Sequence, residues 1–336
     1  MSGVGTGRLV RVEARRFRYR AAVRWLALLA VVAAAVVVTT VFFSARPPSQ
    51  QALADAEQQY AFAQEDWEEN GERYVEECRE GEALAQETDP GADWRCDDME
   101  PRPELYRPVQ PTFADSGSAW LSGATTFLML LAFAAGVTSV TAEIGSGSLG
   151  TWLTFVPRRG RVYASKVAVA ALGVLPTTAL ALALTVGGSW AAAAVNDAVG
   201  GLTTDWWAAL GWQALRALAA AAVLGAAGAA LGFLARSAAA ALGIGIGWLL
   251  LVDSVLAGFL PALTPWTLRA SLLAWLDDGF LYWVTAPCPP VDGVPQDAGC
   301  TVERTVSMLH GGVLLAVVAA VLVARGALVF RRRDVD

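Results

Sequence analysis

Residues 142–166 read AEIGSGSLGTWLTFVPRRGRVYASK, and they decide the fold because they join two apolar runs that are each long enough to cross a bilayer. The stretch carries Arg158, Arg159 and Arg161 and ends at Lys166. Positively charged connections between membrane spans face the cytoplasm. We therefore expect this connection, called the elbow below and placed at 143–166, at the cytoplasmic surface of a membrane protein.

A short helix is predicted inside the elbow. Residues 145–148 are all glycine or serine, which favours the end of the preceding helix. Apolar residues then recur at spacings of three and four, which predicts one apolar helix face: Leu149, Trp152, Leu153 and Val156. Pro157 ends this helix, and the arginines follow. The pattern is typical of a small docking helix.

The order of residues in the elbow resembles the motif of ABC-2 type transporter permeases. The matching positions are Glu143, Gly147, Ser148, Leu149, Leu153, Pro157, Arg159, Arg161 and Lys166. The resemblance implies a coupling helix, between the second and third transmembrane helices, that contacts a separate ATPase subunit. With Trp152 and Arg158 added, these residues form the expected ATPase contact. The resemblance also implies a second permease copy or a related permease, with ATP and Mg on the ATPase and no cofactor on this chain.

The composition places the remainder of the chain in the membrane. Hydrophobic residues make up 55% of the 336 residues, and the mean hydropathy is +0.45, which is too apolar for an ordinary soluble domain. We predict an all-α integral membrane protein of the ABC-2 type with six transmembrane helices. Their expected ranges are 25–43, 119–142, 167–187, 212–234, 238–260 and 309–330.

Charge fixes the expected orientation of these spans. Between residues 51 and 110 there are 18 acidic residues against 5 arginines, within a segment at 44–118 that we expect to be a helical, extracytoplasmic acidic insert. The loop at 188–211 has no lysine or arginine, and the segment at 261–308 is expected outside with short interfacial helices. Both termini, including the basic tail at 331–336, are then cytoplasmic. We expect the protein to reside in the plasma membrane.

The first 24 residues are expected to form an interfacial amphipathic helix. One predicted face carries Arg8, Arg11, Arg15 and Arg18. Another carries Val10, Ala14, Phe17 and Ala21. Such a helix would lie in the membrane surface with its arginines among anionic lipid head groups. The alternative is a disordered basic tail that only sets the orientation.

All four cysteines lie in segments predicted to be outside, where disulfides persist. We expect Cys78 to pair with Cys96 and Cys288 with Cys300, because pairing within each segment requires no contact between segments. Three pairings are possible from four cysteines.

Two charges lie deep in apolar sequence, Arg216 and Asp253. Their expected depths are similar, so they could pair within the membrane, or each could reach outer water separately. Glycines at helix-contact spacings predict close packing of the fourth and fifth spans, or a dimer contact: Gly225, Gly228, Gly232, Gly243, Gly245 and Gly247.

Several activities are excluded or disfavoured. A phosphate-binding loop needs Gly before its lysine and Ser or Thr after it, whereas Lys166, the only lysine, lies between Ser165 and Val167. His310 is the only histidine and has no second ligand type nearby in sequence, so no metal site is expected. We expect no catalytic residues and no nucleic-acid partner.

The sequence thus predicts a permease subunit of an ATP-driven transporter, exporting a small molecule, drug, peptide or lipid. A membrane-anchored sensor or scaffold that displays the acidic insert is the alternative. An ion-coupled carrier is a third reading, which would depend on Arg216 and Asp253.

Overall fold

The computed structural model of the chain describes residues 6–88, 91–155, 158–287 and 299–332. The chain divides into two compact units. The first, called the membrane bundle below, comprises residues 1–43, 112–285 and 301–336. The second, called the insert, comprises residues 44–111 and 286–300. Each unit is described by itself.

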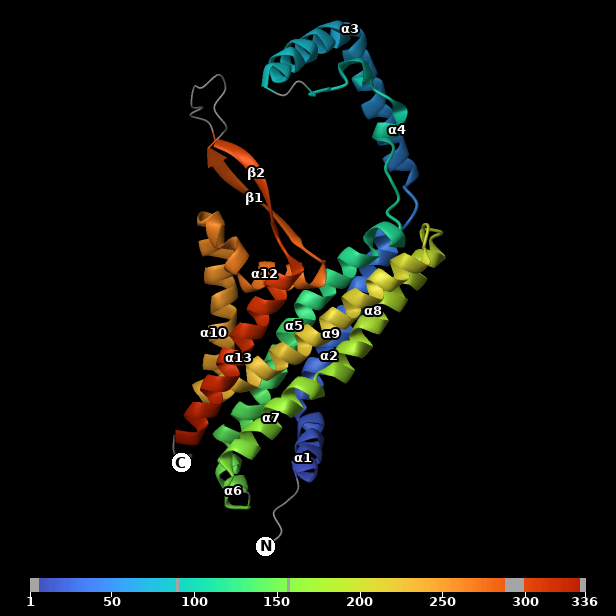
Figure 1. The fold of residues 1–336 in the computed structure, drawn as a ribbon. Helices are drawn as coiled ribbons and strands as arrows, with labels where there is room; N and C mark the ends of the chain where they lie inside the picture. Colours follow the sequence, from blue (N-terminus) through green and yellow to red (C-terminus); the bar gives the residue numbers. More distant parts are fainter. Residues whose placement is uncertain (1–5, 89–90, 156–157, 288–298, 333–336) are drawn as a thin grey trace. The chain divides into compact units, whose positions relative to one another are not determined.

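The structure is mostly helical (Figure 1). The helices of the membrane bundle are α1 (Thr6–Tyr19), α2 (Ala21–Ser44), α5 (Phe113–Gly145), α6 (Ser148–Phe155), α7 (Arg159–Gly173), α8 (Leu175–Val195), α9 (Thr204–Ala235), α10 (Ala238–Gly247), the π-helix η2 (Trp248–Leu256), α11 (Ala257–Phe259), the 3-10 helix η3 (Pro261–Trp266), α12 (Leu268–Leu276) and α13 (Met308–Arg332). The insert holds α3 (Gln50–Thr88), the 3-10 helix η1 (Cys96–Asp98) and α4 (Pro103–Tyr106). Strands β1 (Phe280–Pro287) and β2 (Gly299–Val306) form a two-stranded sheet.

Six helical segments in the described chain are long and apolar enough to cross a membrane. They are Ala21–Ser44, Phe113–Gly145, Arg159–Val195, Thr204–Ala235, Ala238–Phe259 and Met308–Arg332. Each contains or closely overlaps one predicted span, so the prediction of six apolar helices of membrane-spanning length is confirmed, which is consistent with a multi-pass membrane protein. Several of these helices are longer than the predicted spans. The third begins at Arg159, so residues 159–166, which we expected in the elbow, belong to α7.

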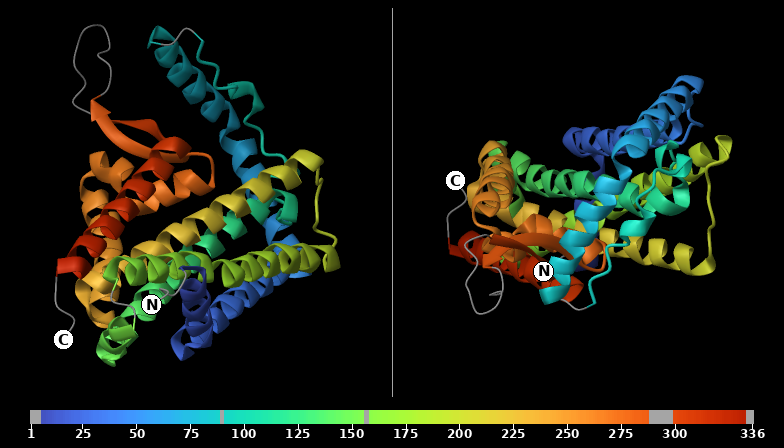
Figure 2. Two further views of the ribbon diagram at one scale, coloured as in Figure 1. Left: turned by 60° about the horizontal axis from the view of Figure 1, so that its bottom comes forward. Right: turned by 90° about the horizontal axis from the view of Figure 1, so that it is seen from above.

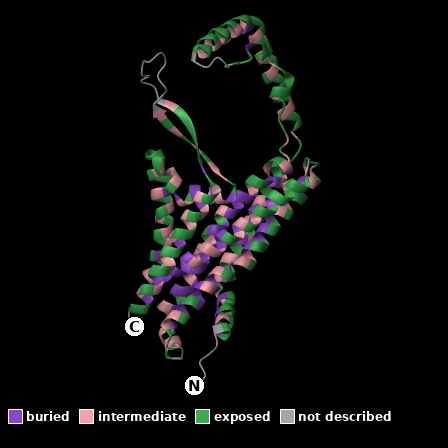
Figure 3. Ribbon diagram, in the orientation of Figure 1, coloured by how far each residue is buried: buried purple, intermediate pink, exposed green. Residues whose placement is uncertain are grey.

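Glycines bring the two most buried spans, α5 and α9, into close contact (Figures 2 and 3). A Cβ atom at Gly136 would lie 2.2 Å from the carbonyl oxygen of Gly225, and one at Gly228 would lie 2.2 Å from that of Phe133. Gly232 likewise faces Val137 of α5. The glycines of the fourth span therefore pack against α5 and, at Gly225, against Ala170 of α7 at 2.7 Å, and not against the fifth span as the sequence suggested.

The fifth span leaves its own glycines largely open. A Cβ atom at Gly243 or Gly247 of α10 would meet no atom within 4 Å, whereas one at Gly245 would meet the Phe133 ring of α5 at 2.8 Å. The predicted packing of these three glycines against the fourth span is therefore wrong. The dimer contact, which was the other possibility, stays a prediction.

The expectation of an all-α chain needs one correction, in the segment at 261–308. Short helices are present there, as expected, in η3 and α12. They are followed by strands β1 and β2, whose sequences are FLYWVTAP and GCTVERTV. Aromatic and β-branched residues favour strands, and this local preference outweighs the helical character of the rest of the chain.

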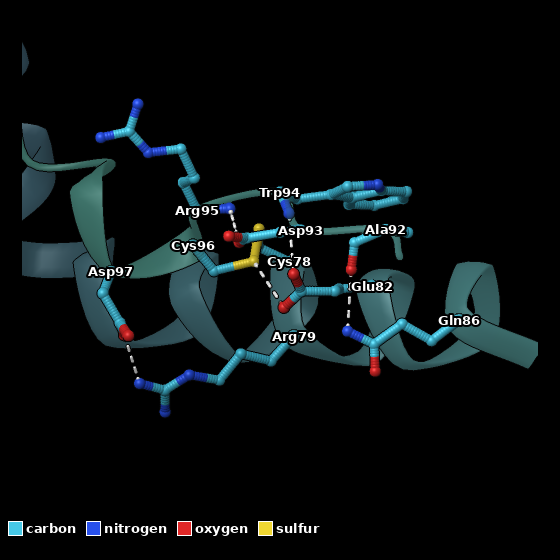
Figure 4. The surroundings of a disulfide bond; sticks show 10 residues. All are labelled: Cys78, Arg79, Glu82, Gln86, Ala92, Asp93, Trp94, Arg95, Cys96 and Asp97. Carbon is cyan, nitrogen blue, oxygen red and sulfur yellow. Dashed lines mark hydrogen bonds and ion pairs between the residues drawn. A yellow bond between two sulfur atoms is a disulfide. The ribbon is translucent and has the colours of Figure 1, made fainter. Parts of the chain in front are cut away.

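The insert is built on α3, and a disulfide holds the following loop against that helix (Figure 4). The bond joins Cys78 to Cys96, as predicted. The Glu82 carboxylate accepts a hydrogen bond from the Trp94 backbone N–H at 2.7 Å, and the Gln86 side chain donates to the Ala92 carbonyl at 2.9 Å. Arg79 pairs with Asp97 at 2.5 Å. Residues 92–97 are thus fixed along the last turns of α3.

The second predicted disulfide involves Cys288, which lies outside the described residues. The pairing of Cys288 with Cys300 therefore stays a prediction.

Candidate functional site

The elbow contains the short helix that the sequence predicted. Helix α5 ends at Gly145, and Gly147 has φ +69°, a backbone conformation that favours glycine. Helix α6 begins at the next residue, Ser148, and its hydroxyl lies 3.4 Å from the carbonyl oxygen of Glu143. The glycine therefore turns the chain, and the serine holds the start of α6 beside the end of α5. Pro157 and Val156 lie outside the described residues.

A cluster of buried charged side chains lies where α1, α5 and α7 meet, next to the elbow. The Nζ atom of Lys166 on α7 is 2.8 Å from Oε2 of Glu13 on α1 and 2.5 Å from Oε2 of Glu143 on α5. The three side chains are 3% to 8% exposed. Lys166 therefore connects the two spans that flank α6, and it connects both of them to the N-terminal helix.

Two arginines extend the cluster. Arg20, between α1 and α2, forms an ion pair with the other carboxylate oxygen of Glu143 and donates to the Thr138 carbonyl at 3.3 Å. Arg16 lies 3.9 Å from the second oxygen of Glu13, and its guanidinium is 4.3 Å from the centre of the Trp152 ring on α6. The Glu13–Arg16–Trp152 contacts therefore join α1 to α6 as well.

The cluster is costly to break, because its charged groups are buried. Removing charges from water costs several kcal/mol per ion, and their mutual attraction offsets this cost only when the geometry is good. Each carboxylate here has a cation on both oxygens, although the distant oxygen of Glu13 has no hydrogen bond within the described residues. Loss of one member would leave a buried charge without its partner, so the cluster favours the observed arrangement of α1, α5 and α7.

This burial divides the predicted elbow residues into two groups. Glu143, Leu149 and Lys166 are buried, Leu149 with an exposed fraction of 1%, so their side chains hold α6 in place and offer little surface to another protein. Trp152 and Leu153 are half-buried. The side chains of Arg158 and Arg161 are exposed, and those of Thr151 and Thr154 form the exposed face of α6. The surface available to a partner is thus narrower than the apolar face that the sequence predicted.

The sequence interpretation missed Glu13 and Arg20. A signal was present, because Glu13 is the only acidic residue among the first 24 and is spaced four residues from both Leu9 and Phe17. In the structure these three residues form the buried face of α1, with exposed fractions of 3% to 5%. Of the predicted apolar face, Phe17 is buried, Val10 is half-buried and Ala14 is exposed, while Ala21 is the first residue of α2. The contact of this face with lipid stays a prediction.

The two deep charges do not pair with each other. Arg216 lies 3.6 Å from Asp278. Asp253, in η2, accepts hydrogen bonds from the backbone N–H groups of Leu268 at 3.3 Å and Arg269 at 2.8 Å. These N–H groups belong to the first turn of α12, where a helix has no internal acceptors for them and where its dipole favours an anion. Asp253 thus serves as a cap for α12, so the proposed ion pair with Arg216 is not formed.

No group of three or more histidine, cysteine, aspartate or glutamate side chains in the described chain could hold a metal ion. The ring nitrogen Nε2 of His310 is 2.9 Å from the carbonyl oxygen of Pro265, and the ring packs edge-on against Trp266. His310 therefore connects α13 to η3.

Comparisons of the chain with protein-family models, with curated proteins and with solved structures found no match. Function must therefore be argued from the site itself.

Proposed function

We propose that this chain is the membrane-spanning subunit of an ABC-2 type transporter, with α6 as the helix that receives force from a separate ATPase. The observation that carries the proposal is the position of α6: a helix of eight residues between two membrane spans, with the Lys166 ion cluster behind it. A push on α6 would be passed to α5 and α7 through Glu143 and Lys166, and to α1 through Glu13.

The proposal assigns separate roles to the elbow residues. Trp152 and Leu153 would supply the apolar part of the ATPase contact, and the exposed Arg158, with Thr151 and Thr154, would supply its polar rim. Glu143 and Lys166 would position α6 without touching the partner. ATP and Mg would bind to the ATPase, and a second permease copy would complete the transporter. Export of a small molecule, drug, peptide or lipid is the proposed direction.

A substitution on α6 tests the assignment. Subunit contacts concentrate their binding energy in a few large side chains, each contributing roughly 1–3 kcal/mol or more. Leu153→Asp should reach the membrane at normal levels and lose a co-purifying subunit that hydrolyses ATP. Thr154→Arg, at an exposed position, should also weaken the association because it adds bulk to the outer side of α6 without disturbing the cluster.

Leu105→Asp is the matched control, because Leu105 is 77% exposed on α4 of the insert, far from α6 in sequence. It should leave the copurified ATPase activity unchanged. If both α6 variants retain that activity, α6 is not the contact. If no ATPase copurifies even with the unchanged chain, the alternative of a membrane-anchored sensor or scaffold that displays the insert gains support.

A further inference from the structure

One face of α1 carries four arginines that the ion cluster does not use. Arg8, Arg11, Arg15 and Arg18 are all exposed and are spaced by three, four and three residues. At roughly 100° per residue they cover about 80° of the helix circumference. We call this set the arginine stripe.

The stripe has no acidic partner within the described residues. The ion pairs of α1 involve Arg16, and Glu13 with Lys166, but none of the four stripe arginines. Glu13 lies on the opposite side of the helix, roughly 180° from the centre of the stripe. The four guanidinium groups are therefore exposed and available to an anion from outside the described chain.

The position of α1 indicates which anion this is. Helix α1 packs along the side of α7: Glu13 contacts Lys166, and the Phe17 ring would lie 2.8 Å from a Cβ atom at Gly173, further along the same helix. Helix α7 is the first part of a membrane span. Its first three residues include Arg159 and Arg161, which are typical of the boundary between lipid and water. Helix α1 lies beside this end of α7 (Figure 1), so we expect the stripe at the level of the lipid head groups.

We propose that the arginine stripe binds the head groups of anionic phospholipids, and that this binding holds α1 against α7. Guanidinium groups form paired hydrogen bonds with phosphate oxygens. Anionic lipids attract arginines near the membrane surface. A lipid held on one side of α1 presses Glu13, on the other side, toward Lys166. The proposal adds a lipid site to the proposed function and stands whether or not an ATPase binds α6.

The full chain in nanodiscs tests this proposal. Hydrogen exchange of the α1 backbone should be slower in discs that contain phosphatidylglycerol than in discs of phosphatidylcholine alone. Native mass spectrometry of the detergent-purified chain should show retained phosphatidylglycerol. The variant R8Q/R11Q/R15Q/R18Q should lose both effects. Each arginine should contribute roughly fivefold to lipid affinity, so the combined loss for four arginines is roughly 600-fold.

Matched variants test whether binding depends on positive charge alone, on the guanidinium group, or on the position of the arginines in α1. R8K/R11K/R15K/R18K keeps the positive charge and should retain most of the binding. R73Q/R79Q/R95Q/R102Q removes four exposed arginines from the insert and should bind phosphatidylglycerol like the unchanged chain. Soluble glycerophosphate should not replace the lipid, because it is not concentrated at the membrane surface.

Three results would overturn the proposal. The first is equal retention of phosphatidylglycerol and phosphatidylcholine. The second is unchanged lipid binding in the glutamine variant of the stripe. The third is full protection of α1 by soluble glycerophosphate or by a copurifying protein in discs of phosphatidylcholine alone, which would assign the stripe to a different anion.

Discussion

At the residue scale, Lys166 joins the end of the elbow to both α1 and α5. It is the only lysine of the chain, and it lies between two buried carboxylates from different helices. A lysine suits this position because its ammonium group presents three donors around one point, whereas the planar fork of arginine matches a single carboxylate. Arg20 instead divides its guanidinium between the other oxygen of Glu143 and the Thr138 carbonyl.

Replacing Lys166 with Met should destabilise the membrane bundle by roughly 3–5 kcal/mol, because Glu13 is left buried with Arg16 as its only nearby cation. The double variant Glu13→Gln with Lys166→Met should recover part of this loss, since the unpaired charge is gone. Thermal unfolding of the purified chain measures both. Arg73→Met breaks an exposed pair with Glu77 and should cost less than about 1 kcal/mol. A double variant no more stable than Lys166→Met alone would show that charge pairing is not the cause.

At the element scale, small residues allow the most buried helices, α5 and α9, to pack closely. In a membrane the lipid tails are as apolar as leucine, so close backbone approach and packing drive helix association. Helices α5 and α9 achieve this through Gly136, Gly225 and Gly228. Spacing alone could not say which neighbour these glycines face, because that depends on how the helices are rotated about their axes. This is why the sequence predicted the glycines but assigned them to the wrong pair of spans.

Substituting Gly228 by Ala should destabilise the contact between α5 and α9, because the new Cβ atom would lie 2.2 Å from the backbone carbonyl oxygen of Phe133. Overpacking of this kind costs roughly 1–3 kcal/mol. Gly243→Ala is the control: its Cβ atom meets nothing within 4 Å, so the better helix propensity of alanine should leave stability equal or slightly higher. Unfolding temperatures in detergent compare the two, and a similar change in both variants would contradict the role of Gly228.

At the scale of the whole molecule, the sequence was sufficient for the spans and for the elbow helix. Long apolar runs and a basic connection are one-dimensional signals, and a glycine before Ser148 marks a turn locally. The ion cluster was not predictable in this way, because Glu13 and Lys166 are 153 residues apart in the chain. The same holds for Asp253, whose partners Leu268 and Arg269 on α12 follow two further short helices, α11 and η3. Long-range contacts of charged residues need the fold before they can be identified.

The orientation of the bundle in the membrane bears on both the ATPase contact and the lipid contact. Arginines gather around the elbow and in α1, and acidic residues gather in the insert, so the elbow should face the cytoplasm and the insert should lie outside. Two single-cysteine changes at exposed positions test this, Gln58→Cys in α3 and Arg158→Cys before α7. A membrane-impermeant maleimide added to intact cells should label position 58 and spare position 158 until the membrane is opened. The unchanged chain sets the background from its own cysteines. Labelling of position 158 in intact cells would reverse the orientation. The elbow could not then meet a cytoplasmic ATPase, and the arginine stripe would face the leaflet that is poor in anionic lipid.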